Sequence, residues 1–257
     1  MTTFIHPTAL VSPTAKIDSD VKIGPFCVIE DHVSIKSGTT VNSFVHISKN
    51  TSIGKECQIF QGSVIGEIPQ DLKYDGEETK LIIGDRTKIR EFCTINKGTN
   101  ANGETLIGND VLLMAYAHVA HDCIIGNNVI LANGVQLGGH VEIGDWVTVG
   151  GMTPIHQFTK IGCHAFIGGG YRIVQDIPPY ILAMGEPLKY AGINSVGLRR
   201  RHFPPDIRDI IKRVYKMIFK SQTNLSDSVK LIEKDYGEYK EISIILDFIK
   251  NSNRGLI

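Results

Sequence analysis

Imidazole, carboxylate and glycine residues recur at intervals of 18 in the second half of the chain. His121 is followed by Gly139 eighteen residues later, and Asp122 is followed by His140 in the same way. An imidazole near neutrality can act as a general base, and an adjacent carboxylate can orient it. A glycine lets a reacting oxygen approach a backbone N–H, which is the chemistry of an oxyanion hole. The same pattern also includes His118, His156 and Gln157.

Residue types alone leave three interpretations of this group open. The first is a general-base centre on His121 and Asp122. The second is a set of surface histidines that polar turns tolerate. The third is a metal site of His118, His121 and His140, but no cysteine or carboxylate-rich ligand set accompanies them, so we expect no metal. His164 falls in a distant position of the pattern and is not expected to belong.

A six-residue repeat predicts the elements that must position these residues. Stepping by six from Ile5 to Ile173 gives 29 positions, and 26 of them hold Ile, Leu or Val. A second set of small or β-branched residues lies two positions earlier and includes four of the five cysteines. The pattern is typical of a parallel β-helix, in which three short strands close a coil of 18 residues. Residues 18 apart then lie above one another at about 4.8 Å per coil, so the histidines share a corner.

Two polar, glycine-containing stretches, 67–80 and 98–104, interrupt the repeat without shifting its phase. We expect both to project as loops, and long loops on a rigid scaffold often carry function. Asp71 and Lys73 in the first loop are either solvated charges or contacts for a bound molecule.

The period changes towards the C-terminus. We predict a β-helix over 1–177, a linker over 178–193 and a small α-helical domain over 194–257. The helical domain carries 13 basic and 8 acidic residues, a net charge of +5, whereas residues 1–193 carry 14 and 19, a net charge of −5. Eight of those basic side chains lie in 199–220. The run Arg199–Arg201 at the start of this segment is either a charged helix start or a contact for an anion such as a phosphate.

Composition excludes several classes of protein. The 257 residues include 27 basic and 27 acidic side chains, so bulk electrostatic binding to nucleic acid is not expected. No apolar run approaches the ~18 residues of a membrane span. The first residues lack the regions of a secretory signal, and we expect a cytoplasmic protein. Five cysteines without a CxxC pair make a disulfide framework improbable.

The chain resembles the UDP-N-acetylglucosamine O-acyltransferase family, which catalyses the first step of lipid A synthesis in Gram-negative bacteria. The resemblance extends over nearly the whole chain and is most specific in a few short motifs. These motifs are Pro69–Tyr74, His118–Cys123, Leu137–His140, His156–Phe158, Gln175–Tyr180 and Asn194–Arg200.

This resemblance implies a left-handed β-helix that assembles as a homotrimer, with active sites between neighbouring subunits. It implies acyl transfer from acyl carrier protein to the sugar 3-position of a UDP-sugar, without a metal or organic cofactor. His121 then corresponds to the general base, Asp122 to the residue that orients it, and the Gly139 N–H to the oxyanion donor. The basic segment 199–220 corresponds to a docking surface for the acidic carrier. The residues implied to contact the nucleotide sugar or shape the cleft are Asp71, Lys73, His118, His140, His156, Gln157, Asn194 and Arg200.

Several details stay open within this interpretation. Some relatives acylate a 3-amino sugar, and Tyr171–Arg172 and Ser195–Val196 depart from the common hydroxyl pattern, although we favour the 3-hydroxyl. Gly168–Gly170 offer no bulky plug for an acyl groove, so we expect a medium or long 3-hydroxyacyl chain. An acetyl-CoA-dependent sugar O-acetyltransferase would share the repeat but would not need the helical domain. A prism without catalytic function is the non-enzymatic alternative.

Overall fold

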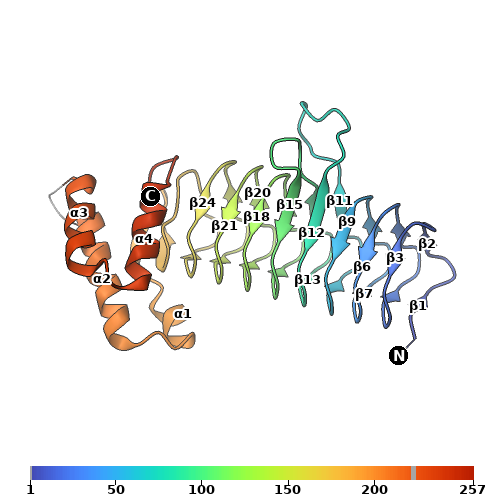
Figure 1. The fold of residues 1–257 in the computed structure, drawn as a ribbon, viewed down its shortest axis with the longest axis horizontal. Coiled ribbons are helices and arrows are strands. Elements are labelled where there is room, and N and C mark those ends of the chain that lie inside the picture. Colours follow the sequence, from blue (N-terminus) through green and yellow to red (C-terminus); the bar gives the residue numbers. More distant parts are fainter. Residues whose placement is uncertain (1, 221–223) are drawn as a thin grey trace.

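The chain folds into a long three-sided prism with a group of helices at its C-terminal end (Figure 1). The computed structural model describes residues 2–220 and 224–257. Each face of the prism is a sheet, and the three sheets contain eleven, eight and eight strands. Successive strands of one sheet are one coil apart in the sequence, and all of them pair in parallel except the last two. This is the parallel β-helix that the six-residue repeat predicts, with the left-handed coil that the resemblance implies.

Most strands are only two residues long, because each hexad turns a corner before the next strand begins. The first sheet consists of β1 (Phe4–Ile5), β4 (Lys22–Ile23), β7 (Thr40–Val41), β10 (Gln58–Ile59), β13 (Lys88–Ile89), β16 (Leu112–Leu113), β19 (Ile130–Leu131), β22 (Thr148–Val149), β25 (Phe166–Ile167), β26 (Ile181–Met184) and β27 (Lys189–Ile193). The second consists of β2 (Leu10–Val11), β5 (Val28–Ile29), β8 (His46–Ile47), β11 (Val64–Glu67), β14 (Thr94–Asn96), β17 (His118–Val119), β20 (Gln136–Leu137) and β23 (Pro154–Ile155). The third consists of β3 (Lys16–Ile17), β6 (Ser34–Ile35), β9 (Thr51–Ile53), β12 (Lys80–Ile83), β15 (Glu104–Ile107), β18 (Ile124–Ile125), β21 (Glu142–Ile143) and β24 (Lys160–Ile161).

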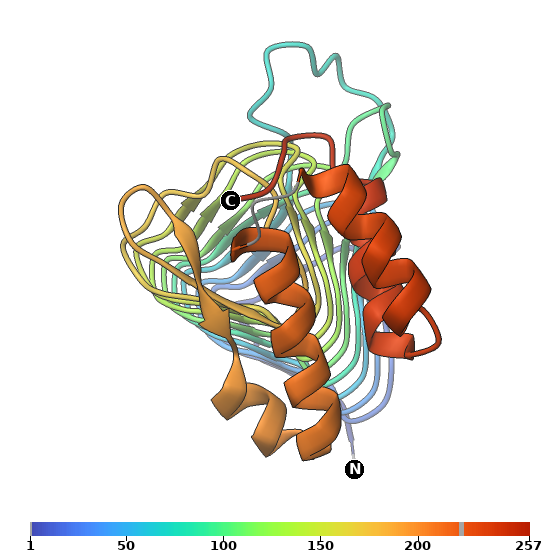
Figure 2. The ribbon, with the colours of Figure 1, turned by 90° about the vertical axis from the view of Figure 1, so that its left-hand side faces the viewer.

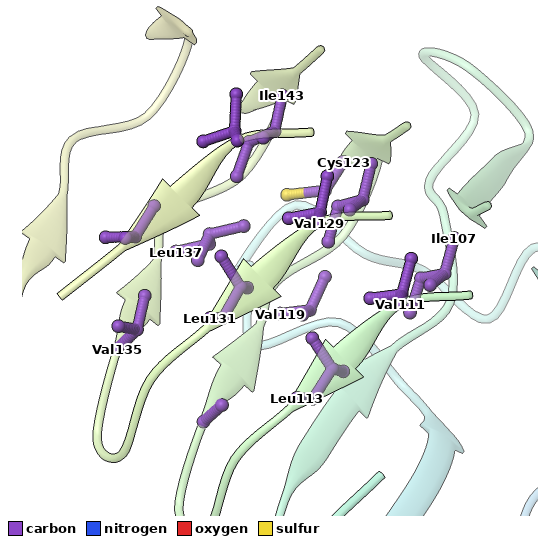
Figure 3. Close-up of a cluster of buried hydrophobic side chains, with 14 of the residues drawn as sticks. Ile107, Val111, Leu113, Val119, Cys123, Val129, Leu131, Val135, Leu137 and Ile143 are labelled. Atoms are coloured by element: carbon purple, nitrogen blue, oxygen red, sulfur yellow. The ribbon is translucent and has the colours of Figure 1, made fainter. Parts of the chain in front are cut away.

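The interior of the prism is filled by the two inward residues of each hexad (Figure 3). Leu113, Leu131 and Val149 stack in register along the first sheet, and each is fully buried. Cys93 and Cys123 are equally buried and fill the second inward position, where burial raises the thiol pKa to about 11 and about 12 respectively. Such thiols are protonated at neutral pH and act as small apolar core residues.

Truncating one core residue is expected to destabilise the whole prism. Leu131→Ala or Ile125→Ala removes methyl groups that are buried in the stacked core. We expect the free energy of unfolding to fall by about 2–5 kcal/mol, measured by urea denaturation. Lys88→Ala, on an exposed position of the same sheet as Leu131, is the matched control and should change it little. Equal stability of Leu131→Ala and the control would contradict the proposed core.

Two loops leave the prism on one side, where the repeat is interrupted (Figures 1 and 2). The longer one connects β11 to β12 and the shorter one connects β14 to β15. Despite these insertions, β11 pairs with β14 and β12 pairs with β15 in parallel. The loops predicted at 67–80 and 98–104 therefore project from the prism as expected, with a local register shift between Ile65 and Glu67 where the longer loop leaves β11.

Residues 178–193 are more ordered than the predicted linker. They form β26 and β27, an antiparallel hairpin that continues the first sheet, with Leu182 paired to Phe166 of β25. Ile181 and Ala183 are fully buried in this hairpin, which explains why the segment packs onto the prism instead of remaining a free connection. The division into domains over 1–177 and 194–257 stays a prediction.

In the described part of the chain, four helices follow the hairpin and lie at the end of the prism (Figure 2). They are α1 (Ser195–Arg200), α2 (Pro205–Lys220), α3 (Leu225–Tyr236) and α4 (Lys240–Lys250). The buried hydroxyl of Tyr215 in α2 donates to the carbonyl of Pro179, and Ser252 after α4 donates to the buried carboxylate of Asp176. These bonds attach the helical region to the last coil. None of the helices within 2–220 and 224–257 combines the length and the apolar character that crossing a membrane requires.

Candidate active site

The corner between the second and third sheets carries the predicted histidine group. His121 and Asp122 lie in the turn between β17 and β18, and Gly139 and His140 lie one coil further on, between β20 and β21. The N–H of His140 donates to the carbonyl of His121 at 3.0 Å. The N–H of Phe158, in the next coil, donates to the carbonyl of Gly139 at 3.0 Å. The stacking predicted from the 18-residue spacing is therefore confirmed.

His121 and Asp122 form a hydrogen-bonded pair. The Nδ1 of His121 lies 2.7 Å from Oδ2 of Asp122, whose side chain is fully buried. Burial by itself would raise the pKa of Asp122, but hydrogen bonds from His121 and Thr99 outweigh it and hold that pKa below its usual range. The ionised carboxylate keeps the proton on Nδ1 and leaves the lone pair on Nε2, which is the arrangement of a general base. Nε2 lies 3.9 Å from Oδ2 of Asp71.

Gly139 lies directly against the imidazole of His121. A Cβ added at Gly139 would lie 2.6 Å from Cε1 and 2.7 Å from Nε2 of His121, closer than real carbon atoms approach. In the described part of the chain, the N–H of Gly139 donates to no acceptor. An unused amide beside the base is suited to bind an oxyanion that forms there.

His140 packs around the same pair. Its ring is perpendicular to that of His121, with centres 5.2 Å apart, and stacks on Phe158 with centres 4.6 Å apart. Its Nε2 lies 3.6 Å from Oδ2 of Asp122, the same oxygen that His121 contacts. Two imidazoles therefore compete for one carboxylate.

His118 and His156 lie at the edges of the group. The Nδ1 of His118 lies 2.7 Å from Oγ1 of Thr94, and burial lowers the pKa of His118, so this ring is neutral at pH 7. His156 is exposed, and its Nδ1 donates to the carbonyl of Gln157 at 3.1 Å. Of the predicted histidines, His121 and His140 contact Asp122. His164, which was not expected to belong to the group, lies on another corner, stacked between Trp146 and Tyr180.

The two loops turn this corner into a cleft. A cavity of about 740 Å³ is lined by the predicted residues Asp71, Lys73, His121, His140 and Gln157. The same cavity is also lined by Gln70, Leu72, Tyr74, Glu77, Thr99, Asn100, Ala101 and Phe158. The two loops are joined by a hydrogen bond, because the backbone N–H of Asn100 donates to Oε1 of Glu77 at 3.2 Å.

Asn194 and Arg200 lie away from this cleft within one chain. They line a second cavity of about 740 Å³ near α1, together with Trp146 and Phe166. Both views place α1 on the side of the prism opposite the loops (Figures 1 and 2). Asn194 is buried and caps α1 by accepting from the N–H of Gly197 at 3.0 Å. The single chain therefore presents two separate groups of predicted residues.

Thr99 was not among the predicted site residues, whereas Arg201 belongs to the basic segment 199–220 that was predicted to contact an anion. Thr99, in the shorter loop, donates twice to the carboxylate of Asp122. Arg201 donates to the carbonyl of Trp146 at 3.0 Å, and its guanidinium lies 5.1 Å from the centre of the Trp146 ring. The position of Thr99 in the sequence, about one coil before Asp122, could have indicated that the two residues lie close together. The interruption of the repeat at 98–104 prevented this, because it makes the number of residues per coil unknown at that point.

One group in the described residues has the geometry of a metal site. Ligand atoms of His121, Asp122 and His140 lie within 4.8 Å of one another. This set differs from the triad considered in the sequence analysis, since it uses Asp122 and not His118. Both carboxylate oxygens of Asp122 already accept hydrogen bonds. That a metal plays no part stays a prediction.

Comparisons of this chain with family models, curated proteins and solved structures all match UDP-N-acetylglucosamine acyltransferases. Residues 176–257 match the family model described as "Udp N-acetylglucosamine O-acyltransferase; Domain 2", and residues 104–139 match the model for the bacterial transferase hexapeptide. A curated protein from Paracidovorax citrulli, an acyl-[acyl-carrier-protein]–UDP-N-acetylglucosamine O-acyltransferase, is 46% identical over 98% of this chain and 98% of its own length.

Two solved structures are similar to the whole chain. A UDP-N-acetylglucosamine acyltransferase from Bacteroides fragilis shares 44% identity with a TM-score of 0.97, over 99% of this chain and 100% of that one. The structure of LpxA from Acinetobacter baumannii shares 42% identity with a TM-score of 0.96, over 99% of both chains.

Proposed function

The chain belongs to the UDP-N-acetylglucosamine O-acyltransferase family, and from this premise we propose how its histidine corner carries out acyl transfer. The protein is an acyltransferase that moves an acyl group from acyl carrier protein to UDP-N-acetylglucosamine in lipid A synthesis. We propose that the acyl group is a 3-hydroxyacyl chain and that the acceptor is the sugar 3-hydroxyl. The group arrives on the phosphopantetheine of the carrier, so the reaction needs no cofactor of its own.

His121 is the general base of the proposed reaction. Its Nε2 takes the proton of the 3-hydroxyl as that oxygen attacks the thioester carbonyl carbon. Asp122 holds the imidazole by Nδ1 and stabilises the positive charge that develops on it. The N–H of Gly139 donates to the carbonyl oxygen as it becomes an oxyanion. When the tetrahedral intermediate collapses, the C–S bond breaks, and the thiolate leaves as a thiol by taking the proton from His121.

One observation carries this mechanism most directly. The backbone at Gly139 is so close to His121 that even a methyl group would collide with Nε2. The Nε2 of His121 and the N–H of Gly139 therefore border the same small volume. The sugar hydroxyl and the thioester carbonyl can come together there. A surface histidine without a function would not require a glycine against its ring.

We propose that the complete site forms between neighbouring subunits of a homotrimer. In one chain, Asp71 and Lys73 lie at the histidine cleft, whereas Asn194 and Arg200 lie at the second cavity. A nucleotide sugar that contacts both groups must bridge two copies. His118, His140, His156 and Gln157 would then shape the sugar side of the cleft, and Arg200 would pair with the diphosphate.

The carrier protein is proposed to dock on α2. Lys212, Lys216 and Lys220 are exposed at intervals of four along this helix and line a groove with Tyr190 and Ser195. Side chains four apart share one face of a helix, so these lysines form a continuous basic row. An acidic carrier suits such a row, and we place the protein in the cytoplasm, where carriers and nucleotide sugars are made.

An acceptor competition tests the finer part of this proposal. Purified protein receives equal amounts of UDP-N-acetylglucosamine and its 3-amino analogue, with 3-hydroxyacyl carriers of increasing chain length, and products are identified by mass. We expect the ester product to predominate and longer donors to be preferred, since each additional buried CH₂ contributes about 0.8 kcal/mol. A predominant amide product would overturn the acceptor assignment. Preference for the shortest donor would overturn the open groove at Gly168–Gly170.

A further inference from the structure

The shorter loop contributes a residue that grips the buried carboxylate of the catalytic pair. The amide of Thr99 donates to Oδ1 of Asp122 at 2.9 Å, and its hydroxyl donates to Oδ2 at 2.7 Å. Oδ2 is also the oxygen that lies 2.7 Å from Nδ1 of His121. Two of the three short hydrogen bonds to this carboxylate therefore come from one residue outside the histidine column.

The two hydrogen bonds from Thr99 also affect which imidazole Asp122 pairs with, because the ring of His140 lies close to the same carboxylate. The Nε2 of His140 lies 3.6 Å from Oδ2 of Asp122, near enough that a small rotation of the carboxylate would pair it with His140 instead. A carboxylate held at both oxygens by Thr99 has no freedom to rotate in this way. With the grip in place, Asp122 serves His121, and Nδ1 of His121 keeps its proton.

The loop itself is held in place by hydrogen bonds that do not involve the Asp122 carboxylate. The hydroxyl of Thr79 donates to the carbonyl of Gly98 at 2.6 Å, and the N–H of Gly103 donates to the carbonyl of Thr99 at 2.7 Å. The side chain of Asn102 donates to the backbone carbonyl of Asp122 at 3.3 Å. Thr99 is thus presented by a closed turn, which gives its two donors a fixed direction.

We propose that Thr99 is a positioning residue that fixes the Asp122 carboxylate on His121 and away from His140. The proposal rests on the proposed role of His121 as the base. The interruption of the repeat at 98–104 then has a specific function. A regular hexad would form a short turn at this point and would place no hydrogen-bond donor next to the Asp122 carboxylate.

The test compares Thr99→Val with Thr99→Ser in the full-length protein. Valine keeps the shape and the amide but removes the hydroxyl donor, whereas serine keeps both donors. We expect kcat for acyl transfer to fall roughly 10- to 100-fold in Thr99→Val, as for a lost hydrogen bond to a charged group, with KM for the UDP-sugar unchanged. Thr99→Ser should retain most of the wild-type kcat.

The pH profile separates positioning from a purely structural role. Hydrogen bonds from Thr99 help to lower the pKa of Asp122, so losing one raises it, and activity should be lost at a higher pH as the solution is acidified. The other charged or titratable groups around this carboxylate are unchanged in the variant. They are His121, His140, Glu77, Cys123, Glu142, Lys160 and Arg254, with Asp71 on the other side of the His121 ring.

Thr105→Val is the matched control. The hydroxyl of Thr105 accepts from the backbone N–H of Asp122 at 2.8 Å and does not touch its carboxylate. This variant should lower the melting temperature and leave the acid limb of the pH profile in place.

A readout without turnover distinguishes failure of this proposal from failure of the proposed function. In protein labelled with ¹⁵N-histidine, the ring shifts of His121 report which nitrogen carries the proton. We expect a single Nδ1–H form in the wild type and a mixture in Thr99→Val. Unchanged shifts and an unchanged pH profile in Thr99→Val would overturn the positioning role. A wild type that transfers no acyl group would instead count against the function and leave the NMR comparison valid.

Discussion

Replacing His121 by alanine is expected to reduce kcat for acyl transfer by roughly 10²- to 10⁴-fold, the usual contribution of a general base. The side chain lies in an outward turn, where it makes no contribution to the core of the prism. Asp122 keeps its hydrogen bonds from Thr99 in the variant, so its burial remains compensated. The fold and the proposed trimer should therefore survive, and UDP-sugar binding should change much less than turnover.

His32→Ala is the matched control for this variant. His32 occupies the same corner of the prism several coils earlier, with a similar positive φ of 59° to that of Asp122, and it is exposed. Its loss should leave kcat unchanged. Rates are measured with carrier-bound donor under saturating UDP-sugar, and oligomeric state is checked by light scattering. A trimer that dissociates in His121→Ala, or a turnover equal to that of His32→Ala, would count against a catalytic role for His121.

Gly139→Ala is expected to have the second largest effect, a fall in kcat of roughly 10²- to 10³-fold, as for loss of an oxyanion-hole donor. The added methyl would lie 2.7 Å from Nε2 of His121, so the imidazole must move or the turn must open. Either movement separates the base from the Gly139 amide. The backbone conformation at Gly139 is ordinary for an L-residue, so the effect comes from the collision and not from backbone strain.

A corner glycine far from the cleft provides the comparison. A Cβ added at Gly24 would meet backbone atoms of Asn42 and Ser43 at 3.0 Å, and no imidazole is near. Gly24→Ala should lower stability somewhat without a specific loss of kcat. If steady-state kinetics show the same small change in both variants, Gly139 does not provide the oxyanion donor.

The sequence predicted most of the prism, because its core obeys a simple rule. Aliphatic residues every six positions, such as Leu113 and Leu131, are buried and stacked in register, as the repeat requires. Beyond residue 107 no insertion disturbs the repeat, so the contacts of His121 with Gly139 and of Asp122 with His140 could be predicted by counting 18 residues.

The 18-residue spacing predicts no contacts for segments that lie outside the repeat. Thr99 reaches Asp122 from a loop whose path depends on its own hydrogen bonds, and those bonds carry no periodic signal. The same holds for Asp71, whose distance from His121 is set by the longer loop. Glycine and proline in 178–193 suggested a linker, yet Ile181 and Ala183 bury themselves against the last coil and form a hairpin.

The placement of Arg200 and Asn194 shows a further limit of sequence patterns. Their residue types suit a nucleotide sugar, but nothing in the repeat indicates which corner the chain reaches after it ends. The structure places them at the second cavity, against strands of the first sheet, whereas the histidines lie at the corner between the second and third sheets. The proposed site between subunits rests on this separation and on the size of the proposed acceptor.

We propose that this protein forms an ester between a carrier-bound 3-hydroxyacyl group and the 3-oxygen of UDP-N-acetylglucosamine. The most direct measurement is the mass of the nucleotide sugar after incubation with the wild-type protein and acylated carrier, followed by NMR assignment of the acylated position. We expect a mass gain of one hydroxyacyl group, located on O3. A folded protein that produces no mass gain, or that acylates another atom of the sugar, would contradict it.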